Sequence, residues 1–406
     1  MATSPFEHVL IGGGIAAGHA LDTLIKEGIP GRSLALVCAE PELPYHRPPL
    51  SKGYLLGSEP RDSIFLKPEG FYEEQGITVL RSTKATAVDP KGHVVTLDHG
   101  QRLQYGKLLI ATGCTPRTLS VPGSDLPGIF TLRTLEDSEK IRDAATRAKR
   151  AVVVGGGFIG MELASAFSQK GLLTTILHRG NAVFDKLGSP EISRFFGDYY
   201  TARGVEIRFE DEAVGFRGSG TVSAVLTKKG ETLLADLVAV GIGVVPDVSF
   251  LEGSGIVVEN GITVNEYMET SVPDAYAAGD VALFFDPLYQ KHRRIEHWDT
   301  AIQQGKVAGK NMAGTREPYG VVSFFFSDIF DLSFDYFGDA EGTDRMIQRG
   351  TFADKAVSIF SVQQNVVRAA FTMGRPKERM KTIRLIKEQT PISDLAALGD
   401  LGTPLP

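Results

Sequence analysis

Short apolar runs that lead directly into glycine clusters occur twice in this chain, as VLIGGG at 9–14 and VVVGGG at 152–157. Each apolar run is typical of a buried strand. The segment after each glycine cluster predicts a helix, over 16–26 in the first copy and over 161–170 in the second. A strand, a glycine turn and a helix in this order begin a dinucleotide-binding unit, so the duplication predicts two bound nucleotides.

A second strand is expected after each helix, over 33–38 in the first copy and over 173–177 in the second. Further buried strands are predicted at 107–112 and 233–240. Prolines follow the strand at 107–112 and indicate a crossing to another domain. A return to the first domain is expected after 240.

The last part of the chain, from residue 323, contains no glycine turn of this kind. Alternating apolar positions predict strands over 357–362 and 366–373, and helices are expected over 383–388 and 392–398. Prolines near the end of the chain indicate a frayed tail.

The predicted fold class is therefore α/β, with two Rossmann-like dinucleotide-binding domains and a C-terminal α+β domain. We expect the first nucleotide domain to comprise 1–116 and 244–322, the second 117–243, and the C-terminal domain 323–406.

Composition narrows the class of protein. The 406 residues include 43 Lys and Arg against 49 Asp and Glu, and this net charge of −6 argues against a nucleic-acid-binding protein. No apolar run is long enough to span a bilayer and no signal peptide is recognised, so a cytoplasmic protein is expected. The two cysteines, Cys38 and Cys114, fit neither a CxxC motif nor a metal site and indicate buried thiols in a reducing compartment.

The first glycine turn has the form Gly12-x-Gly14-x-x-Ala17. Its glycines let the backbone approach a pyrophosphate at the helix N-terminus. Glu40, just past the second strand, is placed to accept hydrogen bonds from an adenosine ribose. An ordinary glycine-rich turn is the alternative, and the order of strand, helix, strand and acid favours the dinucleotide.

The second turn, Gly155-x-Gly157-x-x-Gly160, is the stricter match. NAD sites usually place an acid after the second strand, whereas NADP sites place cations there for the 2′-phosphate. His178 and Arg179 stand at this place and favour NADPH over NADH. A solvated surface arginine is the alternative for Arg179.

Three further segments, PYHRPPLSK at 44–52, ATG at 111–113 and YAAGD at 276–280, resemble those of flavoproteins with two dinucleotide-binding domains. With the two glycine turns, the chain most resembles the FAD-dependent ferredoxin reductases of the putidaredoxin reductase type. It also resembles the apoptosis-inducing-factor-like proteins of the pyridine nucleotide-disulfide oxidoreductase superfamily. The resemblance covers essentially the whole chain. It implies a glutathione-reductase-like fold that binds FAD and NADPH or NADH.

The resemblance implies Lys52 and Glu162 as the catalytic pair, with Lys52 near the flavin N5 and O4 atoms and Glu162 holding its ammonium group. A cation there stabilises negative charge on the reduced flavin. Considered alone, Lys52 is more often a solvated lysine and Glu162 a charge on a helix surface, and only the motif context favours the pair. Asp280 is a contact of the FAD hydroxyls or a helix cap, and Trp298 covers the flavin or fills the core.

The residues that the resemblance implies for FAD are Gly12, Gly14, Ala16, Ala17, Glu40, Arg47, Pro48, Lys52, Ala111, Thr112, Gly113, Arg117, Gly279, Asp280, His297 and Trp298. Those implied for NAD(P)H are Gly155, Gly157, Phe158, Ile159, Gly160, Glu162, His178, Arg179, Gly241, Ile242 and Gly243.

The stretch 42–52 contains no cysteine, whereas disulfide reductases of this fold carry a redox-active cysteine pair in the corresponding helix. Electrons must therefore leave the flavin directly, which suits a one-electron acceptor such as a ferredoxin or a Rieske-type protein. The basic runs at 291–294 and 375–381 are either a docking patch for such an acidic partner or solvated charge. FFFSD at 324–328 replaces a tryptophan-rich form common in oxygenase reductases and resembles the apoptosis-inducing-factor-like branch.

Two other functions stay open at this point. The electrons can pass to a quinone, a semidehydroascorbate-like radical or oxygen, in which case turnover should not depend on salt. The chain can also be a redox sensor that reacts slowly with NAD(P)H and changes its association. A homodimer is compatible with each of these functions.

Overall fold

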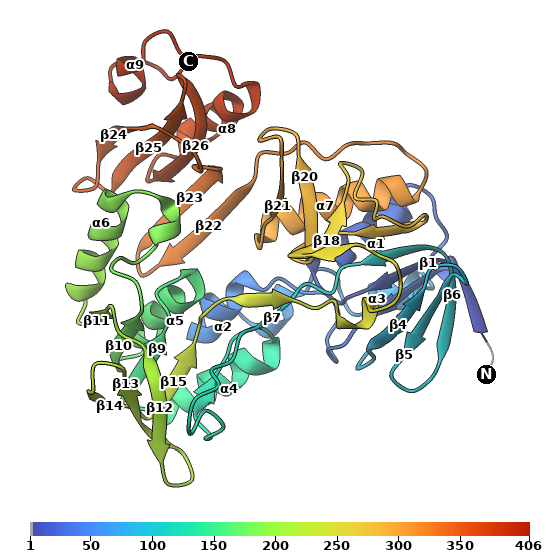
Figure 1. Ribbon diagram of the computed structural model, residues 1–406, viewed down its shortest axis with the longest axis horizontal. Coiled ribbons are helices and arrows are strands. Elements are labelled where there is room, and N and C mark those ends of the chain that lie inside the picture. The colour runs from blue at the N-terminus through green and yellow to red at the C-terminus, as the bar shows by residue number, and fades with distance from the viewer. Residues whose placement is uncertain (1–2) are drawn as a thin grey trace. The chain divides into compact units, whose positions relative to one another are not determined.

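The computed structural model describes residues 3–406, which form two compact units that we describe separately (Figure 1). Unit 1 consists of Met1–His46, Arg61–Thr115 and Val245–Phe325, and unit 2 of Arg47–Pro60, Pro116–Val244 and Phe326–Pro406. The chain crosses between the units at five points, of which two lie in β7 (Cys114–Pro116) and β16 (Val244–Pro246).

The segment Arg47–Pro60, which the sequence places in the first nucleotide domain, groups with unit 2. Two hydrogen bonds attach it to α4 (Leu135–Arg147). Ser138 Oγ donates to the carbonyl of Leu50 at 2.8 Å, and Tyr54 Oη donates to Glu139 at 2.7 Å. A segment expected in the first nucleotide-binding domain therefore belongs to unit 2.

Unit 1 is organised around a sheet of order β3-β2-β1-β6-β5-β4, with β19 beside β6. Strands β1, β2, β3, β6 and β19 are parallel, and β4 and β5 add an antiparallel hairpin at one edge. The bounds are β1 Thr3–Ile11, β2 Leu34–Val37, β3 Thr78–Leu80, β4 Ala85–Asp89, β5 Val94–Leu97, β6 Arg102–Ile110 and β19 Ala275–Ala277. The predicted strands at 33–38 and 107–112 are confirmed as β2 and the end of β6.

Helices α1 (Ile15–Lys26) and α7 (Trp298–Met312) lie side by side in unit 1 (Figure 1). Glycine permits their close approach, because a Cβ at Gly305 would lie 2.2 Å from the carbonyl oxygen of Ala16. A small second sheet has the order β17-β18-β20-β21. Its strands are β17 Val258–Glu259, β18 Gly261–Val264, β20 Ala282–Asp286 and β21 Lys291–Arg294.

Unit 2 contains a second parallel sheet, of order β11-β10-β9-β15-β8. The strands are β8 Ile129–Phe130, β9 Arg150–Val154, β10 Leu173–His178, β11 Glu206–Phe209 and β15 Leu237–Val240. Helix α5 (Phe158–Gln169) follows the second glycine turn and confirms the predicted helix, with an earlier start. An antiparallel sheet of β12 Ala213–Gly218, β13 Val222–Thr227 and β14 Thr232–Leu234 completes this part.

The single strand predicted at 233–240 is wrong, because the chain forms β14 and β15 in two different sheets. Asp236 stands at the break. Its carboxylate accepts hydrogen bonds at 2.9 Å from the backbone N–H groups of Lys149 and Arg150, which continue into β9. The run is apolar on both sides of the break, so its pattern alone does not reveal the change of sheet.

The C-terminal part of unit 2 is a sheet of order β22-β23-β26-β25-β24, with α8 (Arg379–Glu388) packed on it (Figure 1). The strands are β22 Phe324–Ile329, β23 Leu332–Gly338, β24 Arg345–Thr351, β25 Ala356–Gln363 and β26 Val366–Met373. Strands β25 and β26 confirm the two predicted strands. The remaining helices of the chain are α2 Gly53–Leu56, α3 Gly70–Glu74, α6 Pro190–Thr201 and α9 Ala396–Gly399.

The helix predicted at 392–398 is wrong in its first half. The N–H of Ile392 donates to the carbonyl of Asn365, and a helix forms only as α9. The prediction of a frayed C-terminal tail is also wrong. The side chain of Arg349, which is 3% exposed, donates hydrogen bonds to three carbonyls near the end of the chain, those of Leu398, Asp400 and Thr403. A buried cation thus holds the end of the chain.

Replacing Arg349 with leucine is expected to destabilise unit 2 by about 3 kcal/mol or more, because it breaks a buried ion pair and leaves buried carbonyls without donors. The partner carboxylate, Glu378, lies 2.9 Å from Arg349 Nε. Thermal or urea unfolding would measure this loss. Arg384→Leu is the control, because this exposed arginine makes only a loose 4.0 Å pair with Glu388 and should change stability little. Equal loss in the two variants would contradict the structural role of Arg349.

Both cysteines are free and buried, as expected. Within the described residues, no helix has the length and apolar character needed to cross a membrane.

Candidate active site

The first glycine of each dinucleotide turn has a backbone that only glycine adopts easily. The φ angle is +123° at Gly12 and +118° at Gly155. A Cβ would lie 2.2 Å from a carbonyl oxygen in both turns, that of Ala111 in unit 1 and that of Gly241 in unit 2. These glycines bring each turn against the end of the neighbouring strand. The ATG segment at 111–113 therefore contacts the first turn, and the segment 241–243 contacts the second.

Gly14 and Gly157, the last residues of the two GGG clusters, face open space. No atom lies within 4 Å of a Cβ placed on either residue. They are the N-caps of α1 and α5, and neither helix has a side-chain cap or an acidic residue in its first turn. By contrast, α4 is capped by Thr134 and α6 by Ser189. The N-terminal amides of α1 and α5 are thus left for an external anion, and they fit the pyrophosphate of a dinucleotide.

The ends of the second strands are equivalent in the two units, which fixes the register of their side chains. The matched backbone hydrogen bonds are Thr83 N to Cys38 O with Asp211 N to His178 O, and Ser82 N to Glu40 O with Glu210 N to Gly180 O. His178 therefore takes the place of Cys38, and Gly180 takes the place of Glu40. Where unit 1 presents a carboxylate, unit 2 presents no side chain.

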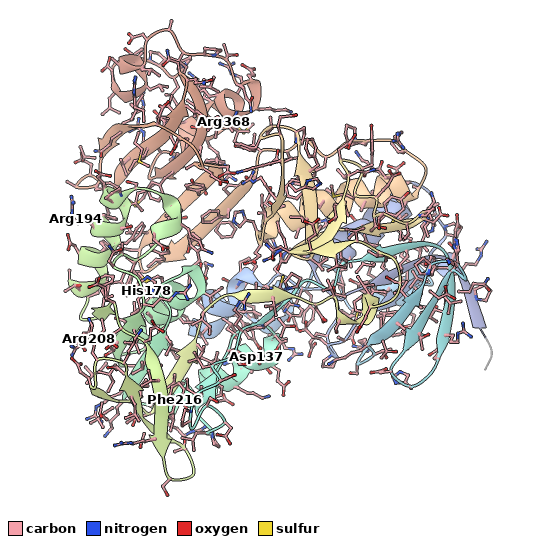
Figure 2. The ribbon with its side chains drawn as sticks, in the orientation of Figure 1. Asp137, His178, Arg194, Arg208, Phe216 and Arg368 are labelled. Atoms are coloured by element: carbon pink, nitrogen blue, oxygen red, sulfur yellow. The ribbon has the colours of Figure 1, made fainter. Side chains whose placement is uncertain are left out.

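His178 stabilises the second glycine turn through a hydrogen bond. Its Nδ1 accepts the N–H of Gly156 at 3.1 Å, and its Nε2 donates to the carbonyl of Ala182 at 3.0 Å. His178 lies at the end of β10 (Figure 2), and its register partner on the neighbouring strand β11 is Phe209. Both ring nitrogens are occupied, so His178 is not free to bind a 2′-phosphate. Arg179 is exposed and makes no hydrogen bond or ion pair with any described residue.

Lys52 and Glu162 form an ion pair within unit 2, although they lie 110 residues apart in the chain. Lys52 Nζ is 2.7 Å from Glu162 Oε1, and the two side chains are 14% and 5% exposed. Ser51 Oγ donates to Glu162 Oε2 at 2.5 Å. A buried carboxylate that receives a cation and a hydroxyl is not a charge on a helix surface, so that alternative is wrong.

Unit 1 positions the acid and the hydroxyl expected near FAD. Glu40 accepts a hydrogen bond of 2.5 Å from Tyr45 Oη, and Thr112 Oγ1 donates to the carbonyl of Asp247 at 2.7 Å. Asp280 is followed by β20 and not by a helix, so the cap alternative for Asp280 is wrong. Its carbonyl accepts from Arg294 at 3.1 Å.

Two ring side chains at the N-terminus of α7, those of His297 and Trp298, contact other aromatic residues. Trp298 Nε1 donates to His46 Nδ1 at 3.2 Å, so Trp298 is tied to the end of the 44–46 segment. The ring of His297 lies 4.5 Å from that of Phe325 between centroids. Its buried Nδ1 has no hydrogen-bond partner among the described residues. An unpaired buried nitrogen beside an uncapped helix N-terminus fits a bound cofactor that supplies the missing partner.

The expected site residues divide between the units. Twelve of the sixteen FAD residues lie in unit 1, whereas Arg47, Pro48, Lys52 and Arg117 lie in unit 2 with all eleven expected for NAD(P)H. In unit 2, Arg47 donates to the carbonyl of Arg133, and the N–H of Arg117 donates to Gly243 O. Sequence reasoning missed the partners Ser51, Tyr45 and Ser327. Ser51 is adjacent to Lys52, but no sequence signal connects Ser327 to the site.

The two basic runs are largely neutralised. In the first, Arg293 pairs with Asp286 at 2.7 Å, and Arg294 with Glu296 at 2.8 Å. In the second, Arg375 pairs with Glu378 at 2.6 Å. These arginines form ion pairs within the protein, so neither run is a continuous free patch of positive charge.

Two dinucleotide turns on separate parallel sheets, with a lysine–glutamate pair at the head of α5, define a nucleotide-dependent oxidoreductase. The chain belongs to the pyridine nucleotide-disulphide oxidoreductase family, whose model matches residues 6–305, and residues 324–406 match the reductase C-terminal family. The resemblance and the fold class expected from the sequence are confirmed. Members use FAD and NAD(P)H, and this chain is an FAD-dependent oxidoreductase of that kind.

Individual relatives match over nearly their whole length. The chain is 34% identical to putidaredoxin reductase of Pseudomonas putida over 403 residues, covering 98% of this chain and 95% of the relative. It is 33% identical to monodehydroascorbate reductase of Pisum sativum over 423 residues, covering 98% of each. Among solved structures, the covalent putidaredoxin reductase–putidaredoxin complex matches with a TM-score of 0.94 and 34% identity, covering 100% of this chain and 98% of the other.

Four histidines make unit 1 sensitive to acid. Burial lowers the pKa of His8 and His46, and it lowers the pKa of His19 and His297 to about 4. Each folded-state pKa lies below the unfolded value of about 6.5, so their contribution to stability is complete above that pH and is lost as the pH falls towards 4.

We therefore expect the unfolding temperature, followed by flavin release, to fall as the pH is lowered from about 6.5 to about 4. The variant His19→Gln should flatten this dependence. His292→Gln is the control, because this exposed histidine should leave the slope unchanged. A His19→Gln variant with the parent slope would contradict the assignment.

Proposed function

We propose that this protein transfers electrons from NADPH, through FAD, one at a time to an iron–sulfur protein of the ferredoxin type. The observation that carries the proposal is the buried Lys52–Glu162 pair, in a chain whose cysteines offer no redox relay. Burial raises the pKa of Cys38 to about 12, so this thiol stays protonated and unreactive.

Bound FAD would supply the redox chemistry, namely uptake of a hydride from NAD(P)H and release of electrons singly. The chain's own residues hold and tune it. The uncapped amides of α1 and α5 bind the two pyrophosphates, and Glu40 accepts hydrogen bonds from a ribose. Lys52 supplies a positive charge, while Glu162 and Ser51 keep its ammonium group in one place.

The relatives support a ferredoxin-type acceptor. Putidaredoxin reductase has been solved in covalent complex with putidaredoxin, and another relative is a ferredoxin reductase subunit of a Sphingobium O-demethylase, 34% identical over 403 residues, covering 98% of this chain and 97% of that protein. A second candidate acceptor is a small organic radical, favoured by the similarity to monodehydroascorbate reductases.

An anaerobic titration of the flavin with NADPH, followed by addition of a [2Fe–2S] ferredoxin, tests the proposal. We expect rapid bleaching of the flavin and transfer to the ferredoxin at a rate that falls with ionic strength. Fast transfer only to monodehydroascorbate, without salt dependence, would support the second candidate. A flavin that stays oxidised would exclude a reductase.

The coenzyme preference depends on Arg179, since Gly180 stands where an acid would select NADH. Arg179→Ala is expected to raise the KM for NADPH about tenfold or more, because a charge-assisted hydrogen bond to phosphate is lost, and to leave the KM for NADH unchanged. Arg194→Ala, an exposed arginine on α6, is the control. Equal effects on both coenzymes would contradict the role, and a parent that prefers NADH would discard it.

A further inference from the structure

The carboxylate of Glu162 has a third donor, from the C-terminal sheet. Ser327 Oγ, on β22, donates to Glu162 Oε1 at 2.6 Å, the same oxygen that lies 2.7 Å from Lys52 Nζ. Ser327 is 1% exposed and Ser51 is 3% exposed. Two hydroxyls and one ammonium group thus donate to a buried carboxylate and occupy three of its roughly four acceptor positions.

Strand β22 and the residue directly after it are attached to α5 at two points with the same spacing. Besides the bond between Ser327 and Glu162, the N–H of Phe330 donates to Ser165 Oγ at 2.9 Å. Each pair of residues is three positions apart, which on α5 is close to one turn. The register of the strand on the helix is therefore determined at two positions, and the hydroxyl of Ser327 is directed at the carboxylate.

The same strand also contacts the lysine. Lys52 Nζ lies 5.7 Å from the centroid of the Phe326 ring, within the range of a cation–π interaction. Neighbouring residues of β22 therefore act on the two members of the pair, Phe326 on the ammonium group and Ser327 on the carboxylate.

We infer that Ser327 is a positioning residue for flavin reduction, through which the C-terminal domain orients Glu162 and thereby Lys52. The inference rests on the proposed role of Lys52 beside the flavin. Without the hydroxyl, Oε1 would keep Lys52 as its only donor, and the carboxylate would rotate towards the ammonium group. The positive charge would then be held less well against the flavin, and hydride transfer would slow while coenzyme binding stayed the same.

Stopped-flow reduction of the FAD-loaded protein by NADPH separates these effects, because it yields the limiting rate and the coenzyme Kd independently. We expect Ser327→Ala to lower the limiting rate about tenfold, with Kd within twofold of the parent. The flavin reduction potential should become more negative. Ser327→Thr, which keeps the hydroxyl, should restore most of the rate. Ser361→Ala removes another buried serine from the same sheet, on β25. It should change neither the limiting rate nor the flavin reduction potential.

A Ser327→Ala protein that retains its flavin and reduces it at the parent rate and potential would overturn the inference. If this variant does not hold FAD, Ser327→Cys preserves the volume with a weaker donor, and an unchanged rate there would overturn the inference equally. Lys52→Met distinguishes the two levels of the argument. If Lys52→Met is as fast as the parent, the proposed role of the pair fails; if only Ser327→Ala is, the positioning role alone fails.

Discussion

A Lys52→Met variant is expected to reduce its flavin with NADPH about a hundredfold more slowly than the parent, because a preorganised charge at the reacting centre typically contributes a factor of this size. Methionine keeps much of the length and apolar character of the lysine stem and removes only the ammonium group. FAD should remain bound, since the uncapped N-terminus of α1 and the carboxylate of Glu40 do not depend on Lys52. Anaerobic stopped-flow absorbance, with the FAD content measured beforehand, checks both statements.

The variant leaves Glu162 as a buried carboxylate without its cation, which lowers stability independently of any catalytic effect. The double variant Lys52→Met/Glu162→Gln removes both charges and should regain stability but not rate. Lys355→Met is the matched control, because this lysine of unit 2 pairs with Asp331 at the surface. Parent kinetics in a folded, flavin-loaded Lys52→Met protein would show that the pair has no catalytic role.

The second large effect is expected at Gly157, where alanine should weaken coenzyme binding about tenfold or more without unfolding the protein. The backbone there has φ −82°, which alanine adopts, and no protein atom lies within 4 Å of the added methyl group. The methyl would instead occupy the space through which the pyrophosphate reaches the first turn of α5. Titration with NADPH measures Kd, and thermal unfolding checks the fold.

Gly155→Ala provides the contrast within the same turn. Its positive φ and the 2.2 Å approach to the carbonyl of Gly241 predict a loss of stability as well as of binding. If Gly157→Ala binds NADPH as the parent does, the turn does not carry the pyrophosphate. If Gly157→Ala unfolds like Gly155→Ala, the open space is not available to a ligand.

Much of the fold followed from local pattern. The duplicated apolar run and glycine turn predicted two nucleotide units, and the strands and helices next to them were confirmed with small shifts at their ends. Failures occurred where a side chain or a distant segment redirected the backbone. Asp236 divides one apolar run between two sheets, and Arg349 holds a tail whose prolines indicated fraying.

For the candidate site, the sequence predicted some residues correctly and misjudged the role of others. Family resemblance named Lys52 and Glu162, and the structure supplied the distance between them. Arg293 and Arg294 formed part of a basic run in the sequence, but each has an acidic partner in the fold. His178 was expected to bind a phosphate and instead supports the glycine turn.

The sequence by itself determined the two dinucleotide turns, because their chemistry depends on backbone sterics within a few consecutive residues. Only the tertiary structure decided that Ser51, Lys52, Glu162 and Ser327 share one buried cluster, and that Gly180, not His178, matches Glu40. These facts depend on the register of strands and on hydrogen bonds between residues up to 165 positions apart in the chain, the separation of Ser327 and Glu162. No local pattern encodes such contacts, since burial and packing select them only when the whole chain has folded.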